Sequence, residues 1–195
     1  HTAPKTKDKL QEAHGGILFI DEAHHLYKPD NERDYGSEAI ELLLQVMENQ
    51  RDDLILIFAG GKEKIDGFFN SNPGISSRIG NHVDFKDYGS EDLIEITKYL
   101  LTNENRYKYT PESIAILQHY IDQLKTFPAF ANARTLKVLV NQLLAFQAIR
   151  VEDTLAKNGS IDYDSLVTIK PEDFTHFTPN DFVNIIGSED VKLYS

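Results

Sequence analysis

The sequence predicts an α/β fold in which a partial parallel-sheet domain is followed by a small α-helical domain. Two short apolar runs, at residues 17–20 and 54–59, flank a segment with helical spacing, which is typical of a parallel strand pair. After Tyr88 the apolar residues recur only at helical spacing, which indicates a second, helical module. We therefore expect a sheet domain at 1–88, a helical domain at 89–175 and a C-terminal tail at 176–195.

The first helix and strand follow from local composition. Residues 4–13 are mostly good helix formers, and Gly15 and Gly16 are expected to end that helix where a left-handed residue is needed. Residues 17–20 form a continuous apolar run, so the sequence predicts a strand that is buried on both faces.

A strand–helix–strand unit is expected next. Helical spacing over 38–49 is carried by Ile40, Leu43, Leu44 and Met47. Residues 54–59 repeat the apolar pattern and end at Gly60-Gly61, so a right-handed crossover should join two parallel strands. A helix at 62–69, a cluster of helix breakers at 70–74 and a short strand at 82–85 complete this domain.

The helical domain is predicted to contain three amphipathic helices. Ser90 is expected to cap a helix over 90–102, and Thr110 to cap the next one. A third helix is expected over 132–156, and a short strand at 166–169. The apolar residues that define the three helices are Leu93, Ile96, Leu100, Ile114, Leu117, Ile121, Leu124, Leu136, Leu139, Val140, Leu143 and Phe146.

Composition excludes several classes of function. The 195 residues carry 20 Lys+Arg against 31 Asp+Glu, a formal net charge of −11, whereas a nucleic-acid binder needs a basic surface. No apolar run approaches the roughly 20 residues that span a bilayer, and no signal peptide is visible, so no membrane partner is expected. The chain has no Cys, which excludes disulfides, thiol nucleophiles and thiolate metal sites.

Two carboxylates follow the first predicted strand. Asp21 and Glu22 stand at its carboxyl end, where open α/β sheets bind their ligands. In nucleoside-triphosphate hydrolysis the first of such a pair can hold Mg²⁺, and the second can orient or deprotonate the attacking water. The alternative is an ordinary polar turn at the end of a strand.

Two arginines are candidates for phosphate binding. The chain has only six Arg beside 14 Lys, so each Arg is a candidate for a role that Lys does not fill. Arg78 follows a Pro-Gly loop, and Arg134 begins a helix of the second module. A guanidinium holds phosphate oxygens through two hydrogen bonds, which Lys does not imitate. A surface salt bridge is the alternative for either residue.

Several segments resemble the AAA+ ATPases of the CbbX type, the red-type Rubisco activases. The matching segments are 15–23, 26–36, 38–41, 44–53, 71–74, 77–79 and 130–134. The Asp-Glu strand alone would indicate only a P-loop-type ATPase, whereas the acidic and aromatic stretch over 26–53 is much more specific. Sporulation-type AAA+ proteins share the beginning of this pattern and are the nearest group with which it can be confused.

The resemblance implies roles for the candidate residues. Asp21 and Glu22 would be the Walker B pair, with Asp21 holding Mg²⁺ through water. Arg78 would be the arginine finger that contacts the nucleotide of a neighbouring subunit. Arg134 would be the sensor-2 arginine, which the helical lid brings to the phosphates of ATP. Family members act as hexameric rings that release sugar phosphates from inhibited Rubisco, and a sugar bisphosphate effector is expected for them.

The sequence also departs from the family pattern. It contains no Gly-x-x-x-x-Gly-Lys-Ser/Thr, the loop that cradles the β- and γ-phosphates. In the family this loop lies upstream of the segment that resembles residues 1–6, and residue 1 is His, so we expect a C-terminal portion of a longer protein. Gly61 stands where Tyr is usual, which leaves the sensor-1 residue unassigned.

One further departure concerns His24 and His25, which replace a pair that is usually aromatic. A histidine pair beside two carboxylates invites a zinc site, but adjacent side chains on a turning chain tend to point apart, which argues against one.

Two functions are left open by the sequence. The first is a catalytic subunit of an ATP-driven Rubisco remodeller. The second is a non-catalytic truncated paralogue that joins complete subunits and lends them Arg78. The acidic composition favours a protein substrate over DNA. The excess of Lys over Arg, with frequent Ile and Asn, favours an algal plastid (chloroplast) over a bacterial cytoplasm.

Overall fold

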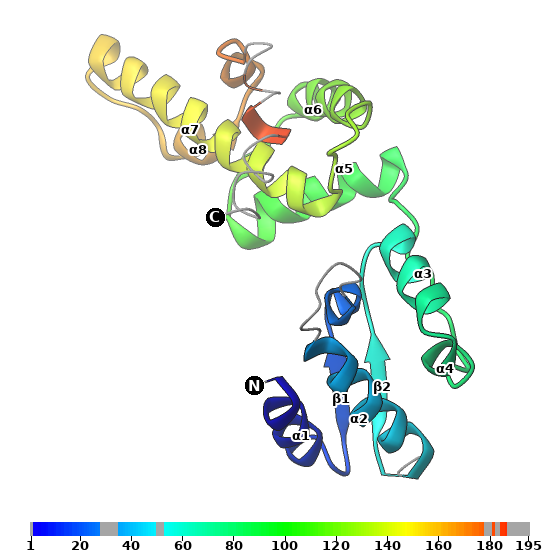
Figure 1. Ribbon diagram of the computed structural model, residues 1–195. Coiled ribbons are helices and arrows are strands. Elements are labelled where there is room, and N and C mark those ends of the chain that lie inside the picture. The colour runs from blue at the N-terminus through cyan, green and yellow to red at the C-terminus, as the bar shows by residue number, and fades with distance from the viewer. Residues whose placement is uncertain (1, 28–34, 50–52, 178–180, 182–183, 187–195) are drawn as a thin grey trace. The chain divides into compact units, whose positions relative to one another are not determined.

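The computed structural model describes residues 2–27, 35–49, 53–177, 181 and 184–186. The chain divides into two compact units, His1–Phe85 and Lys86–Ser195. The first unit contains the α/β elements and the second is helical, in agreement with the predicted fold class (Figure 1). Among the described residues, no helix combines the length and the apolar character that crossing a bilayer requires.

A two-stranded parallel sheet organises the first unit. Helix α1 (Thr2–Glu12) leads through a turn at Gly15, whose φ is +76°, into β1 (Ile17–Ile20). Helix α2 (Tyr35–Asn49) then returns the chain to β2 (Ile55–Phe58). The strands pair in parallel with Ile17 opposite Ile55, which confirms the predicted strand–helix–strand unit.

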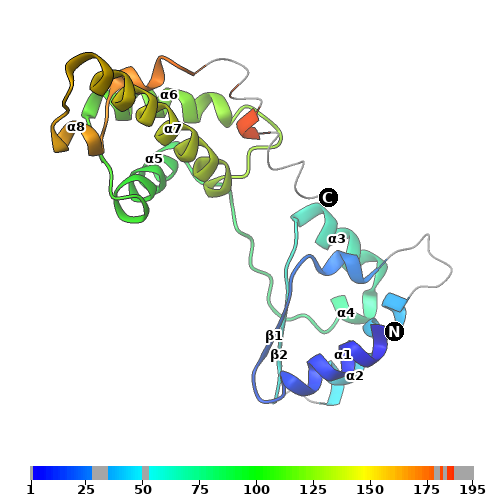
Figure 2. The same cartoon turned by 90° about the vertical axis from the view of Figure 1, so that its left-hand side faces the viewer.

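The helices α1 and α2 cover only one face of this sheet (Figure 2). On the covered face, Leu18 and its neighbours pack against a buried cluster formed by Leu10, Leu43 and Leu54. On the opposite face the apolar side chains are exposed: Ile17 59%, Phe19 59%, Ile55 58% and Ile57 40%. The prediction of a strand buried on both faces is therefore wrong for β1, because no described element covers the second face.

Two short helices complete the first unit. Helix α3 (Lys62–Ser71) and helix α4 (Pro73–Ser76) follow β2, and they pack with α2 around a second cluster. Its buried members are Ile40, Phe68, Phe69 and Ile75.

The short strand predicted at 82–85 does not form. The backbone there has no regular structure, and Phe85 is 91% exposed. A strand forms by hydrogen bonding to a neighbouring strand, and no described segment of the chain lies alongside these residues as one.

The second unit is a bundle of three long helices, as predicted. The three helices are α5 (Ser90–Tyr99), α6 (Pro111–Leu124) and α7 (Ala133–Asn158). Helix α5 continues as a π-helical turn, η2 (Leu100–Glu104). Their apolar stripes meet in one core in which Leu93, Leu117, Ile121, Leu136 and Leu139 are fully buried.

The caps of these helices are partly as predicted. Thr110 caps α6, because its hydroxyl accepts the backbone N–H of Ser113 at 3.2 Å. The predicted cap at Ser90 is wrong by one residue. Gly89 is the N-cap of α5, with its own N–H donated to Asp92, and the Ser90 hydroxyl instead donates to Asp122 on α6.

Short elements close the second unit. Strand β3 (Lys108–Tyr109) pairs in parallel with β4 (Thr168–Ile169), so only the last two residues of the strand predicted at 166–169 are extended. The residues before β4 form helix α8 (Tyr163–Val167), and the 3₁₀ turn η3 (Pro171–Phe174) follows β4. Asp162 caps α8, and its hydrogen bonds with Ser165 hold the pKa of the Asp162 carboxyl below its usual range.

A buried ion pair fixes α7 to this closing segment. Arg150 donates from Nε to the carboxylate of Asp173, a side chain that is completely buried. The same guanidinium donates to the backbone carbonyl of Thr168 at 2.9 Å. Beyond Thr175 the same core still gains members, since Phe177 packs on it and Ile185 and Ile186 are buried in it.

Candidate functional site

The carboxylate pair lies at the edge of the sheet where the parallel strands end. Strand β1 stops at Ile20, whose carbonyl accepts the N–H of Ala59, and Ala23 N–H in turn donates to the Ala59 carbonyl. Asp21 and Glu22 therefore leave the sheet beside the end of β2. Glu22 has φ +46° and ψ 47°, the left-handed conformation that turns the chain out of the strand direction.

The two carboxylates differ in how they are engaged. Asp21 Oδ1 accepts the backbone N–H of Glu22 at 2.9 Å, which leaves the other oxygen to face solvent. An exposed carboxylate of this kind suits a hydrated Mg²⁺, because that ion prefers oxygen ligands and keeps most of its water. Glu22 is also exposed, and its carboxylate can reach a water molecule at the same edge.

The histidine pair behaves differently from the prediction. The turn η1 (Ala23–Leu26) brings the rings of His24 and His25 to 4.2 Å between centroids, so the expectation that they point apart is wrong. The Nδ1 atom of His24 lies 3.1 Å from Glu22 Oε2. A tight helical turn after a left-handed residue brings the side chains of Glu22, His24 and His25 together, and the residue types do not predict this conformation.

Arg78 lies in the segment after helix α4, and its side chain reaches the C-terminal end of α2. It stands one residue beyond Ser77, the C-cap of α4, donates to the carbonyl of Gly74 at 2.8 Å and forms an ion pair with Glu48 at 3.3 Å. Helix α2 runs from the edge where β1 ends back to the edge where β2 begins, and Glu48 stands near its C-terminal end. Among the described residues, no hydrogen bond or ion pair joins the guanidinium of Arg78 to Glu22 of the same chain.

Arg134 belongs to the second unit, on the first turn of α7. Its side chain is exposed, and in the part of the chain that the structure describes no hydrogen bond or ion pair involves its guanidinium. The N-cap before it, Asn132, has a strained φ of +49°. The Asn132 side chain accepts the N–H of Tyr88 and donates to Asp87 at 2.7 Å, so it fixes the start of α7 to the first residues of the second unit.

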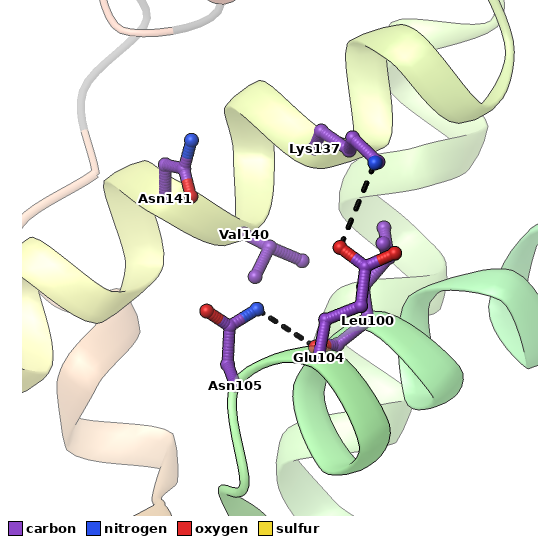
Figure 3. Close-up of a pocket in the computed structure, with 6 residues that line it drawn as sticks. All are labelled: Leu100, Glu104, Asn105, Lys137, Val140 and Asn141. Atoms are coloured by element: carbon purple, nitrogen blue, oxygen red, sulfur yellow. Dashed lines mark hydrogen bonds and ion pairs between the residues drawn. The ribbon is translucent and has the colours of Figure 1, made fainter.

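Two cavities of the described residues are lined by residues other than these candidates. One cavity of about 80 Å³ lies between the π-helical turn η2 and α7, where Lys137 faces Glu104 at 3.6 Å and Asn105 donates to the carbonyl of Leu100 (Figure 3). That volume suits a few water molecules rather than a nucleotide. A second hollow lies between α1 and α2 and is lined by residues such as Leu10, His14 and Val46.

Comparison with protein families decides the class of this chain. Residues 2–86 match the model of the ATPase family associated with various cellular activities (AAA), and residues 89–183 match that of the AAA lid domain. The chain belongs to the AAA+ ATPase family. The succession of a sheet unit and a helical unit is thus an AAA domain followed by its lid.

Individual relatives place this AAA+ chain within the CbbX type. The chain is 56% identical to the protein CfxQ homolog of Cyanidium caldarium over 173 aligned residues. The alignment covers 89% of this chain and 59% of the relative. Identity is 53% to the chloroplastic ribulose bisphosphate carboxylase/oxygenase activase of Cyanidioschyzon merolae (89% and 58% covered) and 50% to the protein CbbX of Cereibacter sphaeroides (89% and 55%).

This AAA+ chain spans less than two thirds of the length of these relatives, which come from both algae and bacteria. The sequence predicts four charged site residues, but it does not point to Asn132, whose side chain joins α7 to Asp87 and Tyr88, or to the buried pair of Arg150 and Asp173. The scarcity of Arg was a signal that could have directed attention to Arg150.

Proposed function

We propose that this chain is part of an AAA+ ATPase that hydrolyses ATP to remodel inhibited red-type Rubisco and release bound sugar phosphates. The observation that carries the proposal is the position of Asp21 and Glu22, side by side at the carboxyl edge of the parallel strands of an AAA domain. Similarity to a Rubisco activase supports the choice of Rubisco as the substrate.

The chemistry assigned to the carboxylates follows from their environments. In ATP bound with Mg²⁺, the γ-phosphoryl group is transferred to water and ADP is the leaving group. Asp21 would hold the ion through its water ligands with the oxygen that the Glu22 N–H does not occupy. Glu22 would accept a proton from the attacking water, because its carboxylate is half exposed at the same edge.

Arg78 would act on the nucleotide of a neighbouring subunit. Its side-chain contacts support a role in trans, because among the described residues they are with Gly74 and Glu48 and not with the carboxylates of Asp21 and Glu22. The exposed Glu48 carboxylate would hold the guanidinium in a screened, easily broken ion pair until a phosphate replaces it. Such an arrangement makes hydrolysis depend on a ring, which we propose to be hexameric.

The remaining parts of the site are proposed from the family. Arg134, exposed on the lid, would contact the phosphates as sensor 2. The chain's sequence has no phosphate-binding loop, so we propose that another stretch of polypeptide supplies it. A sugar bisphosphate would act as effector, and an algal plastid is the proposed location, although CbbX relatives also occur in bacteria.

A chimaera tests the proposal. The part of the Cyanidium caldarium relative that this chain does not match is joined to this chain, and ATP binding and hydrolysis are measured. Glu22→Gln should leave ATP binding unchanged and lower turnover by at least about 100-fold, the usual contribution of a positioned base. The control is Glu63→Gln, an exposed glutamate on α3. Undiminished turnover in Glu22→Gln would refute the role of Glu22.

The second candidate is a non-catalytic subunit that lends Arg78 to complete subunits. The absence of the phosphate-binding sequence from a chain that carries Arg78 favours it. In this case the 195-residue chain should restore hydrolysis to a full-length relative whose own arginine finger is replaced by Ala. The same chain carrying Arg78→Ala should fail to restore it, and failure of both chains would count against this candidate.

A further inference from the structure

The turn after β1 gathers three metal-ligating side chains that the proposed mechanism does not use as a group. Glu22, His24 and His25 each present one ligand atom, and these atoms all lie within 4.8 Å of one another. The pair formed by His24 Nδ1 and Glu22 Oε2 is separated by 3.1 Å. Two ligands of one tetrahedral zinc ion, at bond lengths near 2.05 Å, stand about 3.3 Å apart.

The environment of His24 favours the binding of a cation between these atoms. The side chain is only 16% exposed, and its Nδ1 atom has no contact with solvent and no hydrogen-bond partner of acceptable geometry. Buried imidazole nitrogens normally have a partner, so an ill-aligned approach to a carboxylate leaves this one unsatisfied. A cation bound by both atoms would satisfy the nitrogen and the Glu22 carboxylate together.

The surrounding backbone leaves room for such an arrangement. Gly60, at the end of β2, faces His24, and a Cβ atom there would stand 3.6 Å from Nδ1 and only 2.8 Å from Ile65. His25 is exposed on the 3₁₀ turn, so its ring can adjust its rotamer toward an ion without disturbing the core. Glu22 is likewise about half exposed and can move.

We propose that Glu22, His24 and His25 form a binding site for a divalent transition-metal ion of the zinc class. Two imidazole nitrogens with one carboxylate oxygen suit zinc, whereas Mg²⁺ and Ca²⁺ prefer sites made of oxygen atoms. Three protein ligands and an exposed side leave a coordination position for water. The site is distinct from the hydrated Mg²⁺ assigned to Asp21, whose Oδ1 is bound to the Glu22 N–H.

The site has a consequence for hydrolysis that rests on the proposed function. A zinc ion takes the lone pairs of the Glu22 carboxylate that would otherwise accept a proton from water. Zinc bound at this turn and catalysis by Glu22 therefore exclude each other, and the ion acts as an inhibitor. Binding of the ion itself does not depend on ATP, on a ring or on Rubisco.

Calorimetric titration of zinc chloride into the 195-residue chain tests the site. We expect one zinc per chain, and at least about a tenfold weaker affinity in His25→Ala and in Glu22→Gln, since each loses a ligand. Both residues are exposed, so these variants should keep the fold, which circular dichroism checks. His14→Ala, an exposed histidine of the same unit, is the matched control and should bind as the parent chain does.

A competition experiment separates this site from an oxygen-rich one. A large excess of Mg²⁺ should leave zinc binding nearly unchanged, and Co²⁺ used as a probe should give the visible absorption of a nitrogen-bound ion, lost in His25→Ala. The proposal is overturned if zinc does not bind stoichiometrically, if His25→Ala and Glu22→Gln bind it as the parent does, or if Mg²⁺ displaces it. A chimaera that binds zinc as expected, but hydrolyses no ATP with Mg²⁺ when zinc has been removed, would count against the proposed function alone.

Discussion

At the scale of single residues, Glu22 combines backbone strain with chemistry. A non-glycine residue in the left-handed region costs about 1 kcal/mol, and such residues are frequent at functional sites. In this chain the left-handed turn takes the carboxylate out of the strand direction and brings it to His24. The same conformation thus serves the proposed hydrolysis and the proposed zinc site.

The buried pair of Arg150 and Asp173 gives a prediction about the lid. Arg150→Met leaves a completely buried carboxylate without its cation, so the free energy of unfolding of the second unit should fall by about 3–5 kcal/mol. Chemical denaturation followed by circular dichroism measures this change. The double variant Arg150→Met with Asp173→Leu should recover part of the loss, because it removes the uncompensated charge.

The exposed pair of Lys108 and Asp164 is the control for this prediction. It also joins distant parts of the second unit, but both side chains are largely in water. Lys108→Met should therefore change the stability little. If Lys108→Met destabilised the unit as much as Arg150→Met does, burial would not explain the effect.

At the scale of elements, Gly15 fixes the passage from α1 to β1. Its φ of +76° strains any other residue, although a Cβ atom would meet no neighbour there. Gly15→Ala should thus lower the free energy of unfolding by about 1 kcal/mol through the backbone alone. Gly67→Ala, inside α3 and also free of neighbours, should raise it by up to about 1 kcal/mol. Thermal unfolding measures both effects: the melting temperature should fall in Gly15→Ala and rise in Gly67→Ala.

The elements that the sequence could predict are those that local pattern determines. The stripe of Leu117, Ile121 and Leu124 on α6 follows from helical spacing alone, and the end of β1 just before Asp21 follows from the end of an apolar run. These two features suffice to place a helix and a candidate carboxylate site.

The features that the sequence could not predict depend on distant partners or on the backbone conformation of one residue. Burial of Phe19 and pairing of residues 82–85 both require a neighbour that no described segment provides. The meeting of His24 with His25 depends on the left-handed Glu22 and the turn that follows, which residue types do not reveal.

At the scale of the whole molecule, the uncovered sheet face is the most unusual feature. Ile17, Phe19, Ile55 and Ile57 expose a continuous apolar surface on a sheet of two strands. Such surfaces in soluble proteins are normally covered by a partner or a further segment. The chain also spans only 59% of its Cyanidium caldarium relative, which supports the proposal that further polypeptide completes this unit.

Substitutions on the two faces of β1 test this description. Phe19→Thr should change the free energy of unfolding of the 195-residue chain little and should reduce its self-association and its binding of a hydrophobic dye. Leu18→Thr, on the face that α1 and α2 cover, should be clearly destabilising. Sedimentation velocity and chemical denaturation provide both readouts. Equal destabilisation by the two substitutions would mean that the second face is also covered in solution.

We propose that Glu22 of one subunit and Arg78 of the next complete a single ATP site. ATP hydrolysis by mixed rings of the chimaera tests it most directly, with Glu22→Gln subunits mixed in equal amounts with Arg78→Ala subunits. Each variant alone should be nearly inactive, since an arginine finger contributes about 10³-fold or more. The mixture should recover about a quarter of the parent turnover, because half of the subunits keep Glu22 and half of their neighbours keep Arg78. A mixture no more active than either variant alone would contradict the claim.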